Sequence, residues 1–470
     1  MKLELNYQKS EISVLGTHND GQKVKIMKKF RDLFPGIHEM EDGNAFLLGS
    51  PLTDQSAIVC MDRKIKDLKH LTEKMKNINA HSAFFLFKVS ISTPRLIFFL
   101  RSNPMWRNSL GLERYDAVLK NSLESILNIQ LTTRAWFESS LPIKHGGIGI
   151  RHATDIALPC FLSSIYEVSD LVDKLLSEPY RQIDPALLEA EKLWCEKFGE
   201  LPETQLRNIQ NVWESSEIQY KIDTLSDSLE KKNDKARFAA NSRHESGAWL
   251  RTLPSPQLGT YLTNDEFRVA ISLRLGSPIV QPHVCVYGDK VNRYAHHGLS
   301  CFKSSGTNSR HAAVNNILQR ALKSAGIPAT LEPPGCSRPD GMSRIPWARG
   351  RSLLWDYTGG DTFTPSYLDA SSKHIGYVAK QAEQKKFDHY TDLAKHFIFI
   401  PIATETSGAF GKFCLDLIKN IGSKITDVTN EKRSTSYLIQ RISIAIQKGN
   451  VASILGTIPP TKDLSEIFYL

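Results

Sequence analysis

The stretch SRPDGMSRIPWARGRSLLWDYTGGDT, residues 337–362, holds two aspartates in unusual settings. Asp340 follows a proline, and Asp356 ends the apolar run Leu353-Leu354-Trp355, which has the pattern of a buried strand. A charge at the inner end of such a strand needs either a structural partner or a metal ion. The rest of the chain helps to decide between a structural partner and a metal ion.

The composition is that of an ordinary globular protein with a basic surface. The chain has 470 residues, of which 41% are hydrophobic and 23% charged, and this length predicts about three domains of ~150 residues each. Its formal net charge of +9 favours an anionic partner. Most of the excess lies in residues 282–353, where ten Lys and Arg stand against three acids. A solvated face could carry the same charge.

The cysteines and apolar runs predict a soluble intracellular protein. Seven cysteines without a framework of close pairs are typical of a reducing compartment. The N-terminal residues have the features of neither a signal peptide nor a transit peptide. The most apolar run, residues 83–100, is interrupted by Lys88 and Arg95. We therefore expect neither a membrane partner nor a small-molecule substrate.

The N-terminal half is predicted to be mostly helical. Short strands are expected within residues 5–16 and 45–52. From Ile65 to about residue 230 apolar residues recur at helical spacing, except across residues 142–159. The polar segment KKNDKAR, residues 231–237, is a predicted boundary.

The C-terminal part is predicted to be an α/β domain. Four helices are expected, at residues 308–326, 371–396, 411–425 and 434–448. Three short strand candidates, ATLEP, RPDG and SLLWDYTGGDT, follow the first helix. A fourth, FIFIPIATET, follows the second helix, and its Pro401 suggests a sheet edge or a bulge. This order predicts a mixed four-stranded sheet with Asp340 and Asp356 on neighbouring strands.

Two neighbouring carboxylates are a candidate metal site. Asp340 and Asp356 would repel each other and stay ionised together only beside a cation. Mg²⁺ (or Mn²⁺) prefers oxygen ligands and keeps waters that can attack a phosphodiester. Lys385, Lys386 and Tyr390, on the following helix, could orient that water and offset the charge of the phosphate. Sequence position does not separate the two lysines.

This order of helix, Pro-Asp, strand Asp and helical Lys and Tyr resembles the PD-(D/E)xK nuclease core. More narrowly, it resembles the restriction-enzyme-like endonuclease at the C-terminus of site-specific non-LTR (LINE-like) retrotransposons, where the lysine has moved to the helix. The resemblance implies that Asp340 and Asp356 bind metal and that Lys386 and Tyr390 complete the catalytic set. Two glutamates on adjacent strands are further candidates for this cluster: Glu332 and Glu405.

The resemblance extends upstream in the order of the family. LNYQKSEI (residues 5–12) resembles the strand after the reverse-transcriptase active site, with Lys9 as its lysine. FLLGSPL (46–52) resembles the primer grip, and LPIKHGGIGIRHATDIALPCFLSS (141–164) resembles the stretch after the polymerase thumb. The chain lacks the Asp-Asp dipeptide of a polymerase site, so we interpret it as the back part of a retroelement polyprotein without polymerase activity.

The segment HVCVYGDKVNRYAHHGLSC (residues 283–301) resembles the zinc knuckle that precedes the nuclease in these elements. Cys285, His297 and Cys301 match its ligands, but Tyr287 stands where the second cysteine belongs. The knuckle could be held by packing alone, or one of two histidines could complete the zinc set: His283 or His296. The remaining cysteines are expected to be buried thiols: Cys60, Cys160, Cys195, Cys336 and Cys414.

The resemblance implies four consecutive domains. They are a palm remnant (1–60), a helical thumb and linker (61–237), a linker with the zinc-knuckle-like segment (238–306) and a restriction-endonuclease-like domain (307–470).

The sequence leaves two main candidate functions. The first is a metal-dependent endonuclease that nicks target DNA by phosphodiester hydrolysis, and the second is a catalytically inactive remnant that binds DNA or element RNA. An inert translated fragment is a third possibility. A nuclease of this kind would act in the nucleus, after synthesis in the cytoplasm. Four arginines of the basic block are assigned to phosphate contacts: Arg310, Arg320, Arg338 and Arg351.

Overall fold

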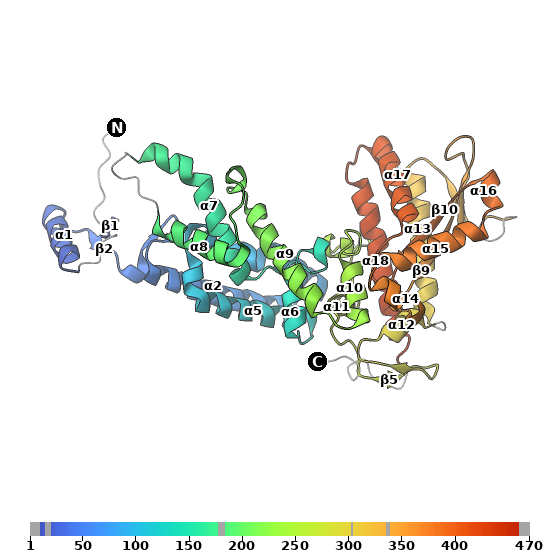
Figure 1. Cartoon of the computed structure of the whole chain (residues 1–470), viewed down its shortest axis with the longest axis horizontal. Helices are drawn as coiled ribbons and strands as arrows, with labels where there is room; N and C mark the ends of the chain where they lie inside the picture. The colour runs from blue at the N-terminus through green and yellow to red at the C-terminus, as the bar shows by residue number, and fades with distance from the viewer. Residues whose placement is uncertain (1–9, 15–19, 177–183, 302–303, 335–338, 460–470) are drawn as a thin grey trace. The chain divides into compact units, whose positions relative to one another are not determined.

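The computed structural model describes residues 10–14, 20–176, 184–301, 304–334 and 339–459 (Figure 1). The chain divides into two compact units. The first comprises Met1–Lys74, Ser90–Leu119 and His152–Glu217, and the second comprises Met75–Val89, Lys120–Arg151 and Ile218–Leu470. The units are interleaved along the sequence, and the four consecutive domains stay a prediction.

The N-terminal half is mostly helical, as predicted. Its helices are α1 (Asp20–Leu33), α2 (Asp54–Met75), α3 (Ala80–Leu86), α4 (Ile97–Ser102), α5 (Ser109–Leu127), α6 (Thr133–Ser139), α7 (Ala153–Leu175), α8 (Pro185–Phe198), α9 (Gln210–Ser228), α10 (Lys232–Asn241) and α11 (Asn264–Leu275). Helix α2 begins well before Ile65, because the Thr53 hydroxyl accepts a hydrogen bond from the Ser56 N–H (3.1 Å) and caps its first turn.

Short strands accompany these helices. β1 (Glu11–Ile12) pairs in parallel with β2 (His38–Glu39). The predicted strand at residues 45–52 is a hairpin of β3 (Phe46–Leu47) and β4 (Ser50–Pro51). Leu48 and Gly49 have φ angles of 50° and 83°, as a two-residue hairpin turn requires. Lys9 lies outside the described residues.

One stretch of the described residues, Ala80–Ser102, is long and apolar enough to cross a membrane by length and composition. It is not one regular helix, because a π turn (Phe87–Ile91) and a 3-10 turn (Thr93–Arg95) separate α3 from α4. Core helices of soluble proteins pass the same test, so the stretch is a weak indication of a membrane protein.

The segment predicted as a boundary, residues 231–237, forms the N-cap and first turns of helix α10. Several of its charges are paired. Arg237 forms a buried ion pair with Glu138 (Nη1–Oε1 2.6 Å), and Arg134 donates to Asp234 (2.7 Å). Its polar composition suggested a boundary because long-range ion pairs leave no local signal.

The C-terminal part contains the predicted mixed four-stranded sheet. Its strands are β7 (Ala329–Leu331), β8 (Gly341–Ser343), β9 (Leu353–Gly360) and β10 (Ile398–Glu405). The order is β10-β9-β8-β7, with β10 parallel to β9 and the other pairs antiparallel. β10 is an edge strand, as Pro401 suggested.

The described residues of this part form α13 (Ser305–Ser324), α14 (Pro365–Ser371), α15 (Tyr377–His389), α16 (Leu393–His396), α17 (Lys412–Thr429) and α18 (Ser434–Leu455). The single helix predicted at residues 371–396 is therefore wrong. Gly376, with φ 73°, precedes α15 in a left-handed conformation, which separates α15 from α14.

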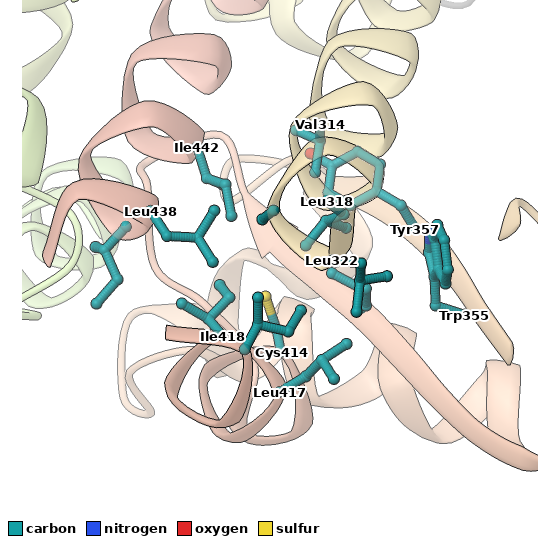
Figure 2. Packing of buried hydrophobic residues seen from close by; sticks show 14 of the residues in the cluster. Val314, Leu318, Leu322, Trp355, Tyr357, Cys414, Leu417, Ile418, Leu438 and Ile442 are labelled. Atoms are coloured by element: carbon teal, nitrogen blue, oxygen red, sulfur yellow. The ribbon is translucent and has the colours of Figure 1, made fainter. Parts of the chain in front are cut away.

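Strand β9 is buried on both faces, which explains its continuous apolar run. Trp355 and Tyr357 lie in the core that α13, α17 and α18 form (Figure 2). Leu354 points to the other face and packs with Tyr390 and Phe399. Because side chains alternate along a strand, Asp356 shares the face of Leu354, on the side of Tyr390.

The knuckle-like segment is a small packed unit. β5 (His283–Val284) and β6 (Lys290–Val291) form a hairpin, and α12 (His296–Ser300) follows. Its apolar side chains share a core cluster with Val451 and Ile454 of α18. A side chain at Gly298 would meet the Ile454 Cα at 2.8 Å, so the segment lies directly on that helix.

Candidate functional site

The β8–β9 register brings Asp340 and Asp356 to the same level of the sheet. Gly341 pairs with Trp355 and Met342 with Leu354, so the next position places Asp340 opposite Asp356. Residues directly opposite in an antiparallel pair have Cβ atoms about 4.5–5.5 Å apart. The two aspartates are therefore neighbours at the point where β8 begins.

Two side chains of the α15 region hold the Asp356 carboxylate, which is only 3% exposed. Lys386 Nζ lies 2.8 Å from Oδ1, and the Tyr390 hydroxyl donates to Oδ2 (2.6 Å). Burial, together with the hydrogen bond to Asp356, raises the pKa of Tyr390, so this phenol stays protonated and acts as a donor. The structure thus brings Asp356, Lys386 and Tyr390 together.

Asp340 has a different set of partners. Its Oδ2 accepts from the Tyr357 backbone N–H (2.6 Å) and lies 3.0 Å from His311 Nε2. Burial alone would raise the pKa of Asp340, but the hydrogen bonds from His311 and Tyr357 hold it below its usual value. The hydrogen bond to Asp340 in turn raises the pKa of His311, and the nearby Asp356 charge adds to that effect.

Sequence reasoning missed His311. The residue lies on α13, far upstream of the Pro-Asp, and no local motif marks it. The helical spacing could have pointed to it, because His311 and Asn315 are four residues apart and share a helix face. The Asn315 side chain accepts from Trp355 Nε1 (3.0 Å), so that face of α13 lies along β9.

The structure separates the two candidate lysines. Lys385 Nζ donates to the Tyr367 hydroxyl (2.6 Å), whereas Lys386 contacts Asp356. Beside them lies a hollow of about 460 Å³, lined by Thr358, Gly360, Tyr367, Val378, Ala382, Lys385, Lys386 and His389. The hollow thus has a cationic wall next to the buried carboxylate.

The two glutamates do not join this cluster. Glu332 is exposed, with φ 47°, just beyond the end of β7. Glu405 is buried at the far end of β10 and accepts from the Val378 and Ala379 N–H groups at the start of α15 (3.1 and 3.2 Å). Glu405 therefore caps a helix.

The four arginines assigned to phosphates differ in accessibility. Arg310 is 3% exposed, and its guanidinium donates to Asn450 Oδ1 (2.7 Å). It is too buried to contact a phosphate, so its assignment to a phosphate contact is wrong. Arg320 is exposed, and Arg351 is half-buried with a long contact to the Lys395 carbonyl (3.5 Å). Arg338 lies outside the described residues.

Cys285, His297 and Cys301 converge, and we call them the Cys-His-Cys cluster. Their ligand atoms all lie within 4.8 Å of one another, and both cysteines are buried. Of the residues described, these are the one group of three or more metal-type ligands so close together. His297 Nε2 is buried and has no hydrogen-bond partner among the described residues, so this ring nitrogen is available to a ligand.

The two histidines expected to complete a zinc set are engaged elsewhere. His283 contacts the Gln281 carbonyl through Nδ1 (2.9 Å) and Thr457 Oγ1 through Nε2 (3.3 Å). His296 Nδ1 contacts the Asn233 amide (3.2 Å), and its ring stacks on Phe363. The structure therefore does not support either histidine as the ligand that completes the zinc set.

The other cysteines are mostly the buried thiols that we expected. Cys60, Cys160 and Cys414 are buried, and Cys195 is half-buried. Cys336 lies outside the described residues.

No known protein-family model matches the chain, and no curated protein shows significant similarity to it.

Proposed function

We propose that the chain is a Mg²⁺- or Mn²⁺-dependent DNA endonuclease with a restriction-endonuclease-like C-terminal domain, derived from a non-LTR retrotransposon. The observation that carries the proposal is the convergence of Asp356 on β9 with Lys386 on α15, Tyr390 just after α15, and Asp340, which immediately precedes β8 and does not lie on a strand as we predicted. Because the polymerase aspartates are missing, nicking of nuclear DNA is the activity we assign.

The donor set suits a hard divalent cation. Asp340 and Asp356 offer carboxylate oxygens, which Mg²⁺ and Mn²⁺ prefer. The groups beside them are the Lys386 ammonium and the His311 imidazole. When bound, the metal would supply a polarised water and neutralise charge on the phosphate.

The surrounding side chains have separable tasks. Lys386 is 31% exposed at its side chain, so an ammonium N–H not used by Asp356 can hold a water or a phosphate oxygen. Tyr390 fixes the Asp356 carboxylate, and His311 fixes that of Asp340. These two are positioning residues. Hydrolysis forms one P–O bond to the water oxygen and breaks the P–O bond to the leaving sugar oxygen.

The hollow next to Lys386 offers a place for the scissile strand. Lys385, Lys386 and His389 line it together with the aromatic ring of Tyr367. Basic and aromatic side chains in one groove suit a sugar-phosphate chain with an unstacked base.

A supercoiled-plasmid nicking assay tests the proposal. The purified full chain should convert supercoiled to open-circular DNA with Mg²⁺ or Mn²⁺ and not with EDTA. Asp340→Ala, checked for folding by circular dichroism, should lose this activity. Nicking that survives in Asp340→Ala would refute the site.

The second candidate is an inactive nucleic-acid-binding remnant. Two observations favour it: the Asp356 carboxylate is already satisfied by Lys386 and Tyr390, and the knuckle has Tyr287 in place of a cysteine. DNA binding without metal-dependent nicking by well-folded protein would select this function.

A further inference from the structure

The Cys-His-Cys cluster has three ligands, and a structural zinc ion takes four. We propose that Asp289 is the fourth ligand, so that a carboxylate takes the part that a cysteine at position 287 would have played. The site would therefore bind zinc through two thiolates, one imidazole and one carboxylate oxygen.

The hairpin register places Asp289 beside the cluster. His283 pairs with Val291 and Val284 with Lys290, so Cys285 and Asp289 are the next pair. The Cys285 N–H donates to the Asp289 carbonyl (2.7 Å), which closes that pair. Opposite residues in an antiparallel pair project their side chains from the same face, so the Asp289 carboxylate lies on the side of the Cys285 sulfur.

The Asp289 carboxylate also lies near His297, one of the three ligands of the cluster. Asp289 Oδ2 lies 3.8 Å from His297 Nε2. Two such ligands on a tetrahedral zinc with bonds of about 2.0 Å would be about 3.3 Å apart. The Asp289 carboxylate does not lie within 4.8 Å of all three ligand atoms of the cluster, but its side chain is 69% exposed and can rotate toward them.

Tyr287 contributes its backbone to this arrangement. The Tyr287 residue is 42% exposed, and its backbone N–H donates to the Cys285 sulfur. Such N–H donors stabilise a metal-bound thiolate. The tight turn depends on Gly288, which has φ 97° and carries the chain from Tyr287 to Asp289.

The ligand chemistry identifies the metal class. Two thiolates and an imidazole favour Zn²⁺ over Mg²⁺ or Ca²⁺, and one carboxylate oxygen is compatible with zinc. This site is independent of the proposed nuclease, because it shares no ligand with the Asp340–Asp356 pair.

Metal affinity of four variants tests the proposal. Zn²⁺ affinity of the full chain is measured by competition with a chromophoric chelator, and Co²⁺ substitution reports geometry by visible absorption. The variants are Asp289→Ala, Asp289→Cys, Tyr287→Phe and Cys301→Ser. The wild-type chain should bind about one zinc, and Cys301→Ser should release it.

Asp289→Ala should weaken Zn²⁺ binding at least tenfold and reduce the tetrahedral Co²⁺ bands. Asp289→Cys should bind at least as tightly as wild type, with a stronger thiolate-to-cobalt band, and Tyr287→Phe should leave affinity unchanged. If Asp289→Ala misfolds, Asp289→Asn replaces it. Wild-type affinity in Asp289→Ala, a loss in Tyr287→Phe, or no zinc in folded wild-type protein would overturn the proposal.

Discussion

Lys385 and Lys386 are adjacent in sequence but make different contacts, so alanine variants of the two form a matched pair. Lys386 contacts the buried Asp356, while Lys385 contacts Tyr367. If Lys386 positions the attacking water, Lys386→Ala should slow nicking by about a hundredfold or more. Lys385→Ala should change the rate by much less. Equal effects of the two variants on the nicking rate would contradict the assignment.

Gly341, next to Asp340, is fixed by packing. A Cβ at this position would lie 2.0 Å from Trp355 Cζ2, whose indole is fully buried. Gly341→Ala must therefore displace Trp355 or β8, at a cost of about 1–3 kcal/mol of unfolding free energy. Urea denaturation measures it. As a control, alanine at Gly326, where nothing lies near a Cβ but φ is 74°, should cost less, since it adds no packing clash. An unchanged urea midpoint in Gly341→Ala would show that β8 can shift to accommodate the added methyl group.

The sequence pointed to candidate site residues where a local pattern or the resemblance marked them. Asp356 stands out because a charge ends an apolar strand, and the family order pointed to Lys386 and Tyr390. Arg310 shows the opposite case. Its guanidinium lies against Gly359 and its aliphatic stem against Gly449, two glycines whose side chains would have excluded it, and a basic residue in a basic block gives no warning of this.

At the level of elements, Glu383 of α15 caps the start of α17. Its buried carboxylate accepts from the Cys414 N–H (3.0 Å). Burial raises the pKa of Glu383 from 4.5 to about 7. The folded chain therefore holds this proton more tightly than the unfolded chain does, so its contribution to stability declines as pH rises from about 4.5 to 7.

Glu383→Gln should remove that pH dependence. The glutamine side chain of this variant cannot deprotonate, and its amide carbonyl can still accept from α17. We expect the Tm of Glu383→Gln to rise relative to wild type as pH increases from 5 to 7.5, measured by thermal melts across that range. A Tm difference that is constant with pH would show that Glu383 is ionised throughout.

Elements with strong periodicity were predicted well, and those decided by distant contacts were not. The α13 helix, strands β7, β9 and β10, and α18 follow from local pattern, whereas β8 (Gly341–Ser343) overlaps the predicted strand RPDG only at Gly341. The start of α10 was predicted as a boundary because its charge partners, such as Glu138 for Arg237, lie about a hundred positions away in the sequence. The order of β10 beside β9 is likewise set by the parallel pairing of distant segments.

For the whole molecule, the net charge of +9 predicts salt-sensitive binding to DNA. The exposed Arg344 and Arg349, in the loop between β8 and β9, join Arg320 and Arg351 as candidates for phosphate contacts. Replacing Arg344 and Arg349 with alanine should lower the slope of log K against log salt by about 2. Arg433→Ala, which removes one exposed charge outside this block, is the control for net charge. An unchanged slope in the double variant would exclude the loop.

Nicking and DNA binding by Asp356→Asn, measured on one preparation of folded protein, test the central claim most directly. Asn keeps the shape of the side chain and removes the charge that a divalent ion needs. We predict that Asp356→Asn binds DNA as tightly as wild type, or more tightly, and does not nick it with Mg²⁺ or Mn²⁺. Metal-dependent nicking at the wild-type rate would contradict the claim that Asp356 belongs to a catalytic site.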